Sequence, residues 1–285
     1  MFSSIKRILF VAALLGSAHR ASAGRPPFCP NATLSCHNTT VIANTCCFNA
    51  PGGQLLQTQF WDTDPATGPA DHWTVHGLWP DHCDGTYDSY CDETRQYTNI
   101  TQILEAYNRY DVLNYMRVYW KDNGGDDESF WEHEWGKHGT CISTLDPNCY
   151  IDYTPQEEVV DFFERTVRLF SHLNTYEFLA AANIYPTNST TYTYDQIMSA
   201  LNQPRGVNAT IECDGKFLDQ VYYTFDVRGS VANGQFVPEN PVGEGTTGCP
   251  KTGIQYVPKN LSTVPTPVSS SATVSAPATG KAKLF

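Results

Sequence analysis

Two short segments of the chain surround histidines with tryptophans, glycines and charged residues. They are residues 73–80, WTVHGLWP, and residues 130–141, FWEHEWGKHGTC. Imidazole is the only side chain whose unperturbed pKa lies close to neutral pH. Two imidazoles at one site allow one to accept a proton while the other donates one. The two segments therefore indicate an enzyme that uses acid–base catalysis.

The second segment predicts a helix that aligns its charged groups. If residues 130–137 are helical, Glu134 and His138 are i,i+4 neighbours, and so are His133 and Lys137. We expect Glu134 to hold the ring of His138 and to raise its pKa. His133 and Lys137 then lie on one side of the helix, where they add positive charge for an anion.

The first segment predicts a strand that presents a histidine to a cleft. In an extended strand, Trp73 and Val75 face the interior, while Thr74 and His76 point out together. Taken alone, His76 is more readily interpreted as a core histidine with a structural hydrogen bond. The second segment, with its further histidines, makes a role for His76 in catalysis the better interpretation. Glycine permits another group to approach closely, and we expect such an approach at Gly77, Gly136 and Gly139.

A zinc hydrolase is one alternative, because His133 and Glu134 begin like the H-E-x-x-H motif. That motif needs its second histidine at i+4, on the same face of the helix. Here Lys137 occupies i+4 and would repel a cation, and His138 at i+5 lies about 140° round the helix from His133. The segment does not fit a zinc site, and we expect no metal or other cofactor.

Two imidazoles, a carboxylate and a lysine, without a nucleophile elbow, favour phosphoryl transfer on RNA. RNA carries its own nucleophile, the 2′-hydroxyl group. An enzyme has only to remove the proton of this hydroxyl, protonate the leaving 5′-oxygen and neutralise the charge of the phosphorane.

The acidic composition is an objection to this substrate. The net charge of −12 at pH 7 repels a polyanion at long range. Two effects offset the repulsion. Bases stack on aromatic side chains with about 1–3 kcal/mol each, and acid neutralises carboxylates and charges histidines. We therefore expect an acidic pH optimum.

The N-terminus predicts export from the cell. Residues 1–23 combine basic residues, an apolar run too short to span a bilayer and an A-x-A cleavage site, as in a secretory signal peptide. The chain has 10 cysteines, and an even number indicates disulfides formed in an oxidising compartment. We expect a secreted protein, or one in the lumen of an acidic compartment, with no membrane anchor. Glycosylation sequons lie at Asn31, Asn38, Asn99, Asn188, Asn208 and Asn260.

Helices and strands cluster along the chain rather than alternating. Helical periodicity marks residues 101–120, with a break at Asp111, and shorter helices are expected at 176–182 and 194–202. Thr154, Pro155 and Glu157 read as an N-cap, an N1 proline and a capping-box acid of a further helix. Strands are expected at 55–61, 73–78, 209–213 and 220–227. This order predicts an α+β fold, in which an antiparallel sheet packs against several helices and disulfides staple the chain.

Three regions are expected along the chain. The signal peptide of residues 1–23 precedes one catalytic domain at residues 24–258. Residues 259–285 are rich in Ser, Thr, Pro and Ala. They bury too little apolar surface to offset the entropy of ordering, so we expect a disordered tail.

Both histidine segments resemble the active-site segments of the ribonuclease T2 family, secreted acid endoribonucleases of little base specificity that include the plant S-RNases. The resemblance covers about residues 29–258, including the layout of the cysteines. It implies that a monomer cleaves single-stranded RNA through a 2′,3′-cyclic phosphate to a 3′-phosphate end. His138 would be the general base and His76 the general acid of the first step, with these roles reversed in the second. Glu134 and Lys137 would assist the transition state, and His133 would bind phosphate. The residues alone do not assign acid and base to each step.

The resemblance also implies base-binding residues and disulfides. The first base pocket would be Trp79, Asp81 and Tyr87, and the second Gln59 and Phe130. Without the resemblance, core packing would be the simpler interpretation of the aromatic residues. Spacing alone does not choose among cysteine pairings. The implied disulfides are Cys29–Cys47, Cys36–Cys83, Cys46–Cys149, Cys91–Cys141 and Cys213–Cys249.

Two other functions stay open. One is a catalytically inactive secreted relative that acts as a toxin, inhibitor or surface-binding protein, although every catalytic position is filled. The other is a glycan-binding module, which the aromatic content of 13% suggests. That module leaves the histidines and the lysine without a role.

Overall fold

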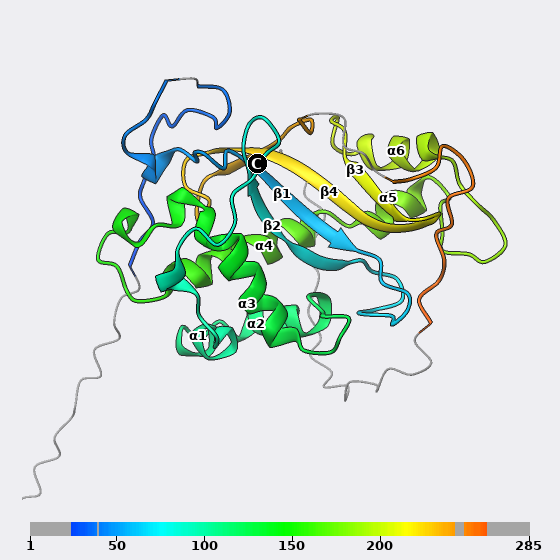
Figure 1. Ribbon diagram of the computed structural model, residues 1–285, viewed down its shortest axis with the longest axis horizontal. Coiled ribbons are helices and arrows are strands. Elements are labelled where there is room, and N and C mark those ends of the chain that lie inside the picture. The colour runs from blue at the N-terminus through cyan, green and yellow to red at the C-terminus, as the bar shows by residue number, and fades with distance from the viewer. Residues whose placement is uncertain (1–23, 39, 243–247, 261–285) are drawn as a thin grey trace, which may run out of the picture.

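A five-stranded antiparallel sheet forms the centre of the fold (Figure 1). The computed structural model describes residues 24–38, 40–242 and 248–260. Four strands lie in the order β2-β1-β4-β3, and β5 pairs with β4. The predicted α+β class is confirmed. The strands are β1 (Gln54–Phe60), β2 (Thr74–Asp81), β3 (Thr210–Asp214), β4 (Phe217–Arg228) and β5 (Gln235–Pro238).

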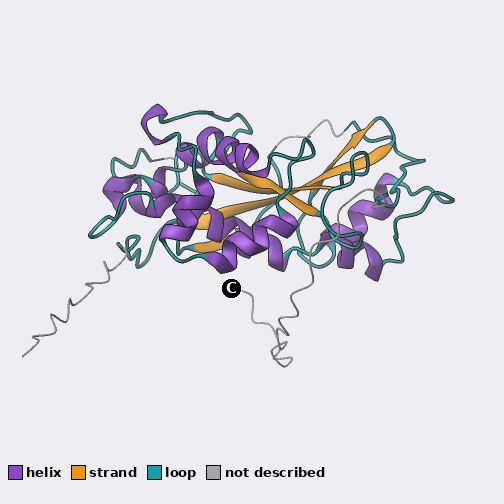
Figure 2. Ribbon diagram, turned by 90° about the horizontal axis from the view of Figure 1, so that it is seen from below, coloured by secondary structure: helices purple, strands orange, loops and turns teal. Residues whose placement is uncertain are grey.

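Helices surround the strands, which cross the middle of the molecule in the view of Figure 2. In Figure 1, α1, α2 and α3 gather at one end, and α5 and α6 lie at the other. The helices are α1 (Ile100–Ala106), α2 (Tyr110–Tyr119), α3 (Asp127–Lys137), α4 (Glu157–His172), α5 (Thr175–Ala181) and α6 (Tyr194–Asn202).

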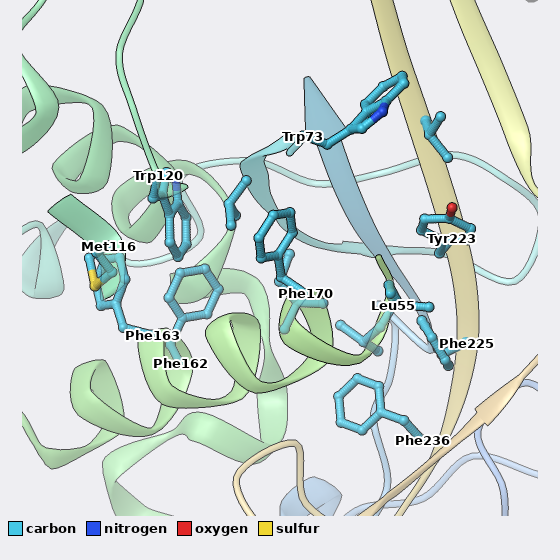
Figure 3. Close-up of a cluster of buried hydrophobic side chains, with 14 of the residues drawn as sticks. Leu55, Trp73, Met116, Trp120, Phe162, Phe163, Phe170, Tyr223, Phe225 and Phe236 are labelled. Carbon is cyan, nitrogen blue, oxygen red and sulfur yellow. The ribbon is translucent and has the colours of Figure 1, made fainter. Parts of the chain in front are cut away.

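The apolar core joins α4 to the sheet and to α2 (Figure 3). Phe162 and Phe163 of α4 are fully buried, and the ring of Phe163 lies 5.2 Å from that of Trp120. Leu55 of β1 and Tyr223 of β4 are buried in the same cluster. Side chains alternate between the two faces of a strand, so the neighbouring positions on β1, β2 and β4 are left to face the other way.

The element boundaries differ from the expectations where the backbone takes an unusual turn. The helix expected at 101–120 is two helices, and the chain breaks before α2 rather than at Asp111, with Asn108 at φ 58°. α4 begins at Glu157 instead of Pro155, because Gln156 has φ 74°. The expected capping-box contact is still present, since the Thr154 N–H donates to the Glu157 carboxylate. Strand β5 was not predicted.

Five disulfides tie the loops to this framework, and they are the pairs that the family resemblance implies. Cys91–Cys141 joins the loop before α1 to the turn after α3, and Cys36–Cys83 joins an N-terminal loop to the loop after β2. The others are Cys29–Cys47, Cys46–Cys149 and Cys213–Cys249.

The packed domain extends one residue past the expected boundary at 258. Lys259 is buried, donates hydrogen bonds to the carbonyl oxygens of Thr67 and His72, and lies 4.4 Å from the centre of the Trp61 ring. The expected signal peptide and residues 261–285 of the expected tail lie outside the described residues. Within the part of the chain that is described, no helix is long and apolar enough to cross a membrane.

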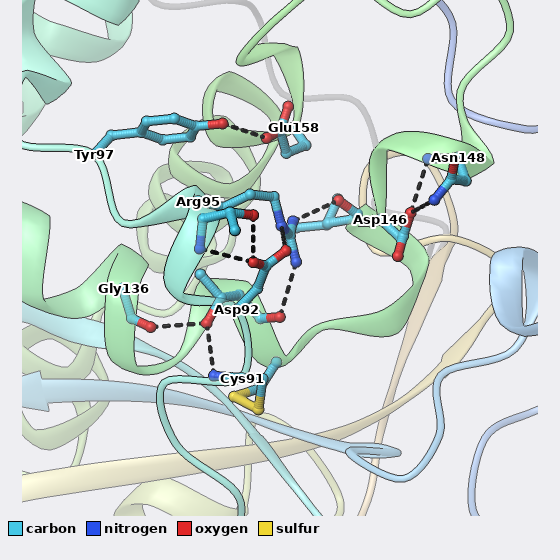
Figure 4. Close-up of polar contacts among 12 residues, drawn as sticks. Cys91, Asp92, Arg95, Tyr97, Gly136, Asp146, Asn148 and Glu158 are labelled. Carbon is cyan, nitrogen blue, oxygen red and sulfur yellow. Dashed lines mark hydrogen bonds and ion pairs between the residues drawn. A yellow bond between two sulfur atoms is a disulfide. The ribbon is translucent and has the colours of Figure 1, made fainter.

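A buried arginine fixes the end of α3 to its surroundings (Figure 4). Arg95 donates to the carboxylate of Asp92 and to the carbonyl oxygens of Leu145 and Thr140. Its own carbonyl oxygen accepts from the indole N–H of Trp135, in the last turn of α3. Because a buried acceptor without a partner is costly, this network holds the turn that carries the second histidine segment.

Replacing Arg95 with methionine tests the network. Arg95→Met leaves two buried carbonyl oxygens and a carboxylate without their donor, so we expect the free energy of unfolding to fall by about 3 kcal/mol or more. Urea unfolding at neutral pH measures the change. The matched control is Arg117→Met, because its ion pair with Glu105 at 3.9 Å and its hydrogen bond to Asn114 at 3.3 Å both lie at the exposed surface. We expect a loss of less than about 0.5 kcal/mol there. Equal losses in the two variants would contradict this role of Arg95.

Candidate active site

A β-bulge aims His76 out of the sheet. Thr58 of β1 pairs with Gly77, whereas the next residue, Gln59, pairs with Val75, so His76 is the extra residue of β2. Such bulges bend a strand and redirect a side chain. The sequence-based expectation that Thr74 shares the exposure of His76 is wrong, because Thr74 is buried.

Two neighbours fix the ring of His76. Its Nδ1 lies 3.0 Å from Oε1 of Gln220 on β4, and since an amide oxygen only accepts, the Nδ1–H is the donor. The ring of Phe60 stacks on it at 3.9 Å with an angle of 19°. This leaves Nε2 as the nitrogen that can exchange a proton with a ligand. Burial, together with the charges of Lys137 and His133, lowers the pKa of His76 to about 3, and the hydrogen bond that Nδ1–H donates to Gln220 acts in the opposite direction.

Glu134 lies fully buried between the two histidine segments. Its Oε2 accepts from the indole N–H of Trp79 at 3.0 Å, and its Oε1 lies 3.7 Å from Nε2 of His76. A Cβ atom on Gly77 would collide with this carboxylate, so the close approach expected at Gly77 is real. Burial raises the pKa of Glu134 to about 8, which keeps the group protonated in acid.

His138 follows the last residue of α3 and is 5% exposed. The indole of Trp79 stacks on its ring at 4.8 Å with an angle of 13°. The expectation that Glu134 bonds to this ring and raises its pKa is wrong. Glu134 is bonded to Trp79 instead, and burial, with Lys137 and His76, lowers the pKa of His138 to about 2. Nε2 of His138 has no hydrogen-bond partner among the described residues.

His133 and Lys137 are less buried than Glu134 and His138. His133 is exposed, and its Nδ1 lies 3.3 Å from the hydroxyl of Tyr90. Partial burial and the charge of Lys137 lower the pKa of His133. The ring of His133 lies 6.4 Å from that of His138. His133 therefore adjoins the two buried imidazoles and remains open to solvent.

The close approach of another group that we expect at Gly136 is absent from the described part of the chain. A Cβ atom there would meet only the Gln96 side chain, at an ordinary 3.7 Å. Gly139 does fit, because a Cβ atom would overlap the indole ring of Trp135.

The three residues expected to form the first base pocket lie at and just beyond the end of β2. Asp81 and Tyr87 form an isolated β-bridge, and the Tyr87 side chain is 64% exposed. Burial raises the pKa of Asp81 to about 7, although His82 acts in the opposite direction. Trp79 is partly buried, with one face of its indole against His138. A base can reach only what this contact leaves free.

The second pocket is only partly as expected. Gln59 is fully buried on the core side of the sheet, where its amide bonds to Gln57, Leu173 and Thr175, so the structure does not bring it to the site. Its neighbour Phe60 faces His76 instead. Phe60 and Phe130 line a cavity of about 230 Å³ whose other walls are polar. They are Asp62, Lys121, Asp122, Asn123 and Asp219.

Phe60 and Gln220 are the residues that sequence reasoning missed. In residues 54–61, QLLQTQFW, polar and apolar side chains occur on both faces of the strand, so alternation does not show which face is which. No local signal links Gln220 to His76, 144 positions away.

None of the six asparagines in the glycosylation sequons is buried.

Three residues beside the two imidazoles form a donor set that could hold a metal ion. His133, Glu134 and His138 offer ligand atoms within 4.8 Å of one another. Lys137 acts on both histidines with positive charge, which opposes a cation there.

Comparison with known proteins identifies relatives of the whole domain. The model of the Ribonuclease T2 family matches residues 52–233. Ribonuclease Trv of Hypocrea rufa is 60% identical over 81% of this chain and 98% of that protein. A ribonuclease T2-like protein of Aspergillus fumigatus is 55% identical over 81% of this chain but 56% of its own length, so the chain spans about half of it. The crystal structure of Actibind, described as a T2 ribonuclease, matches with a TM-score of 0.77 and 51% identity, over 81% of this chain and 97% of that one.

A methyl group on Gly77 tests the packing of Glu134. Gly77→Ala places a Cβ against the buried carboxyl group and 2.7 Å from Nε1 of Trp79. We expect the free energy of unfolding to fall by about 1–3 kcal/mol, as in overpacked cores. Gly136→Ala is the control, because helical glycine is less favourable than alanine by up to about 1 kcal/mol and there is room for the methyl group. Denaturant unfolding measures the stability of both variants. A Gly77→Ala protein as stable as Gly136→Ala would contradict the close packing of Glu134 against Gly77.

Proposed function

Because the chain belongs to the ribonuclease T2 family of endoribonucleases, we propose that it cleaves single-stranded RNA by transphosphorylation with His76 and His138 as the acid–base pair. The products are a 2′,3′-cyclic phosphate and then a 3′-phosphate end. The observation that carries the proposal is the placement of both imidazoles against one indole. Trp79 stacks on His138, and its ring meets His76 edge-on at 4.6 Å.

In the first step, Nε2 of His138 takes the proton of the 2′-hydroxyl group. The absence of a partner for this atom among the described residues supports the role, since the substrate would supply one. The 2′-oxygen attacks phosphorus, and Nε2 of His76 gives a proton to the leaving 5′-oxygen. Water then reverses the path, with His76 as base and His138 as acid. Each positioned proton transfer contributes about 10²–10⁴-fold to the rate.

Polar groups around the imidazoles stabilise the negative charge of the phosphorane. Lys137 and a protonated His133 bind the phosphate oxygens at the exposed rim. Burial raises the pKa of Glu134 to about 8. Below that pH, Glu134 is a neutral carboxylic acid that can donate a hydrogen bond. Fixed donors of this kind stabilise charge that develops in a transition state. No step in this scheme requires a metal ion.

Bases are held by aromatic stacking more than by charge. Tyr87 and the free part of Trp79 stack on the first base, and Asp81 bonds to its polar edge. Phe60 and Phe130 form the walls of the second position, in place of the pair of Gln59 and Phe130 expected from the sequence. Because stacking accepts every base, little base specificity follows.

The remaining sequence-based expectations complete the proposal. The enzyme is exported by the signal peptide at residues 1–23, is glycosylated at one or more of its six sequons and acts as a monomer outside the cell or in an acidic lumen. The accessible positions of the sequon asparagines support the glycosylation.

Single substitutions in chelator test the reaction itself. We expect the purified protein to cleave poly(A) in EDTA and to release cyclic phosphate ends. His76→Ala and His138→Ala should each lower kcat by at least about 10³-fold, because proton transfer and charge stabilisation are lost together. Circular dichroism should show an unchanged fold. A wild type that is inactive in EDTA, or a fully active His76→Ala variant, would reject the proposal.

The pH dependence follows from the lowered histidine pKa values. Burial holds the pKa of His76 at about 3 and that of His138 at about 2 in the free protein, so the charged acid of the pair becomes more abundant as the pH falls. Bound phosphate shifts both values upward. Because kcat reports the groups of the complex, we expect kcat to be highest below about pH 6 and to fall as the pH rises. A maximum at pH 8 would contradict this assignment.

Gln220 serves as a positioning residue for His76. Gln220→Glu places a carboxylate on Nδ1, which raises the pKa of His76, so we expect the alkaline limb of the pH–rate profile to move to higher pH. Gln220→Leu removes the acceptor and should lower kcat by about tenfold or more with little change in KM. Identical pH profiles for wild type and Gln220→Glu would show that Gln220 does not act through the ring of His76.

A further inference from the structure

A second group of possible metal ligands lies away from the proposed catalytic residues. Nε2 of His37 is 3.1 Å from Oδ2 of Asp226 and 3.9 Å from Oε2 of Glu239. The ligand atoms of all three residues lie within 4.8 Å of one another. Ligand bonds of about 2.0–2.2 Å in tetrahedral geometry place ligand atoms about 3.3–3.6 Å apart. The two separations of 3.1 Å and 3.9 Å lie on either side of this range, and none in the group exceeds 4.8 Å.

Rigid backbone holds each of the three ligands. Asp226 lies on β4 between β1 and β5, and the N–H of Glu239 continues the sheet by donating to the Thr224 carbonyl oxygen. His37 follows directly on Cys36, which is tied to Cys83 by a disulfide. A site whose ligands are already in place loses little entropy on binding.

The carboxyl groups of this cluster lack a permanent cation. The Asp226 side chain is 2% exposed, and its Oδ1 has no hydrogen-bond partner among the described residues. The ion pairs that Asp226 and Glu239 form in the described part of the chain are with His37, and neither pairs with a lysine or an arginine. A buried carboxylate requires compensation, and a dication would compensate both acids at once.

We propose that His37, Asp226 and Glu239 bind a divalent transition-metal ion of the zinc type. One imidazole nitrogen and two carboxylate oxygens suit zinc, whereas calcium and magnesium take oxygen ligands. The His37 side chain is 55% exposed and that of Glu239 is 34% exposed, so water can complete the coordination. The ion links the loop after Cys36 to the strands β4 and β5, and its role is to stabilise the fold. The inference is independent of the proposed RNA chemistry.

Zinc binding to the intact protein tests the site. Calorimetric titration with zinc chloride near neutral pH should give one equivalent more for the wild type than for His37→Ala. Glu239→Gln keeps the shape of the side chain and removes its charge, so it should bind that equivalent at least about tenfold more weakly. Zinc should raise the Tm of the wild type and leave that of His37→Ala unchanged. A wild type that binds no zinc would overturn the proposal.

Two further variants separate this site from other histidines. His82→Ala removes a similar surface pair, because Nε2 of His82 lies 3.0 Å from Asp88, but it does not belong to a three-ligand group. It should keep the wild-type stoichiometry. His133→Ala removes a ligand of the group beside the catalytic residues and should keep the equivalent that depends on His37. If His82→Ala loses as much zinc as His37→Ala, or if His37→Ala binds like the wild type, the proposal is overturned.

Discussion

The arrangement of the catalytic end depends on one buried carboxyl group, that of Glu134, packed against the backbone of Gly77. Any side chain at position 77 would occupy the space that the carboxyl group fills. The carboxyl group accepts the indole N–H of Trp79, which fixes the plane on which His138 stacks. Its other oxygen lies beside Nε2 of His76. One polar group thus sets the relative position of two segments that are about sixty residues apart in the chain.

Both the sheet and helix α3 hold the groups that surround the Glu134 carboxyl group. On the sheet side, the bulge in β2 turns His76 outward, and Gln220 of the neighbouring strand holds its ring. On the helix side, the Arg95 network anchors the end of α3. Crowding these groups together has an electrostatic consequence. Burial disfavours the charged forms of both imidazoles and of the carboxyl group, so near neutral pH these three groups are uncharged while the positive charge of Lys137 acts on both imidazoles.

Residue types and short-range spacing predict much of this molecule. The α+β class follows from clustered helices and strands, and α3 provides the helix over residues 130–137 that the i,i+4 argument takes as its condition. The cysteine pairing required the family resemblance, because spacing permits many alternatives. The partner of Glu134 could not be predicted, since i,i+4 geometry permits a contact with His138 but does not exclude a better donor from another strand. The resemblance implies Gln59 as a base-binding residue, but Gln59 is buried on the core side of β1. A strand with polar side chains on both faces does not reveal which face is buried, and only packing against α5 and β4 decides it.

Acid–base catalysis by this pair requires that His76 and His138 share one buried, charge-coupled site with Lys137. An NMR titration of the histidine rings measures this coupling. Both rings should titrate well below the ordinary range near 6.5, and Lys137→Met should raise both pKa values, because the lysine charge lowers each of them. If both rings titrate near 6.5 and do not respond to Lys137→Met, the imidazoles do not form the common site described here.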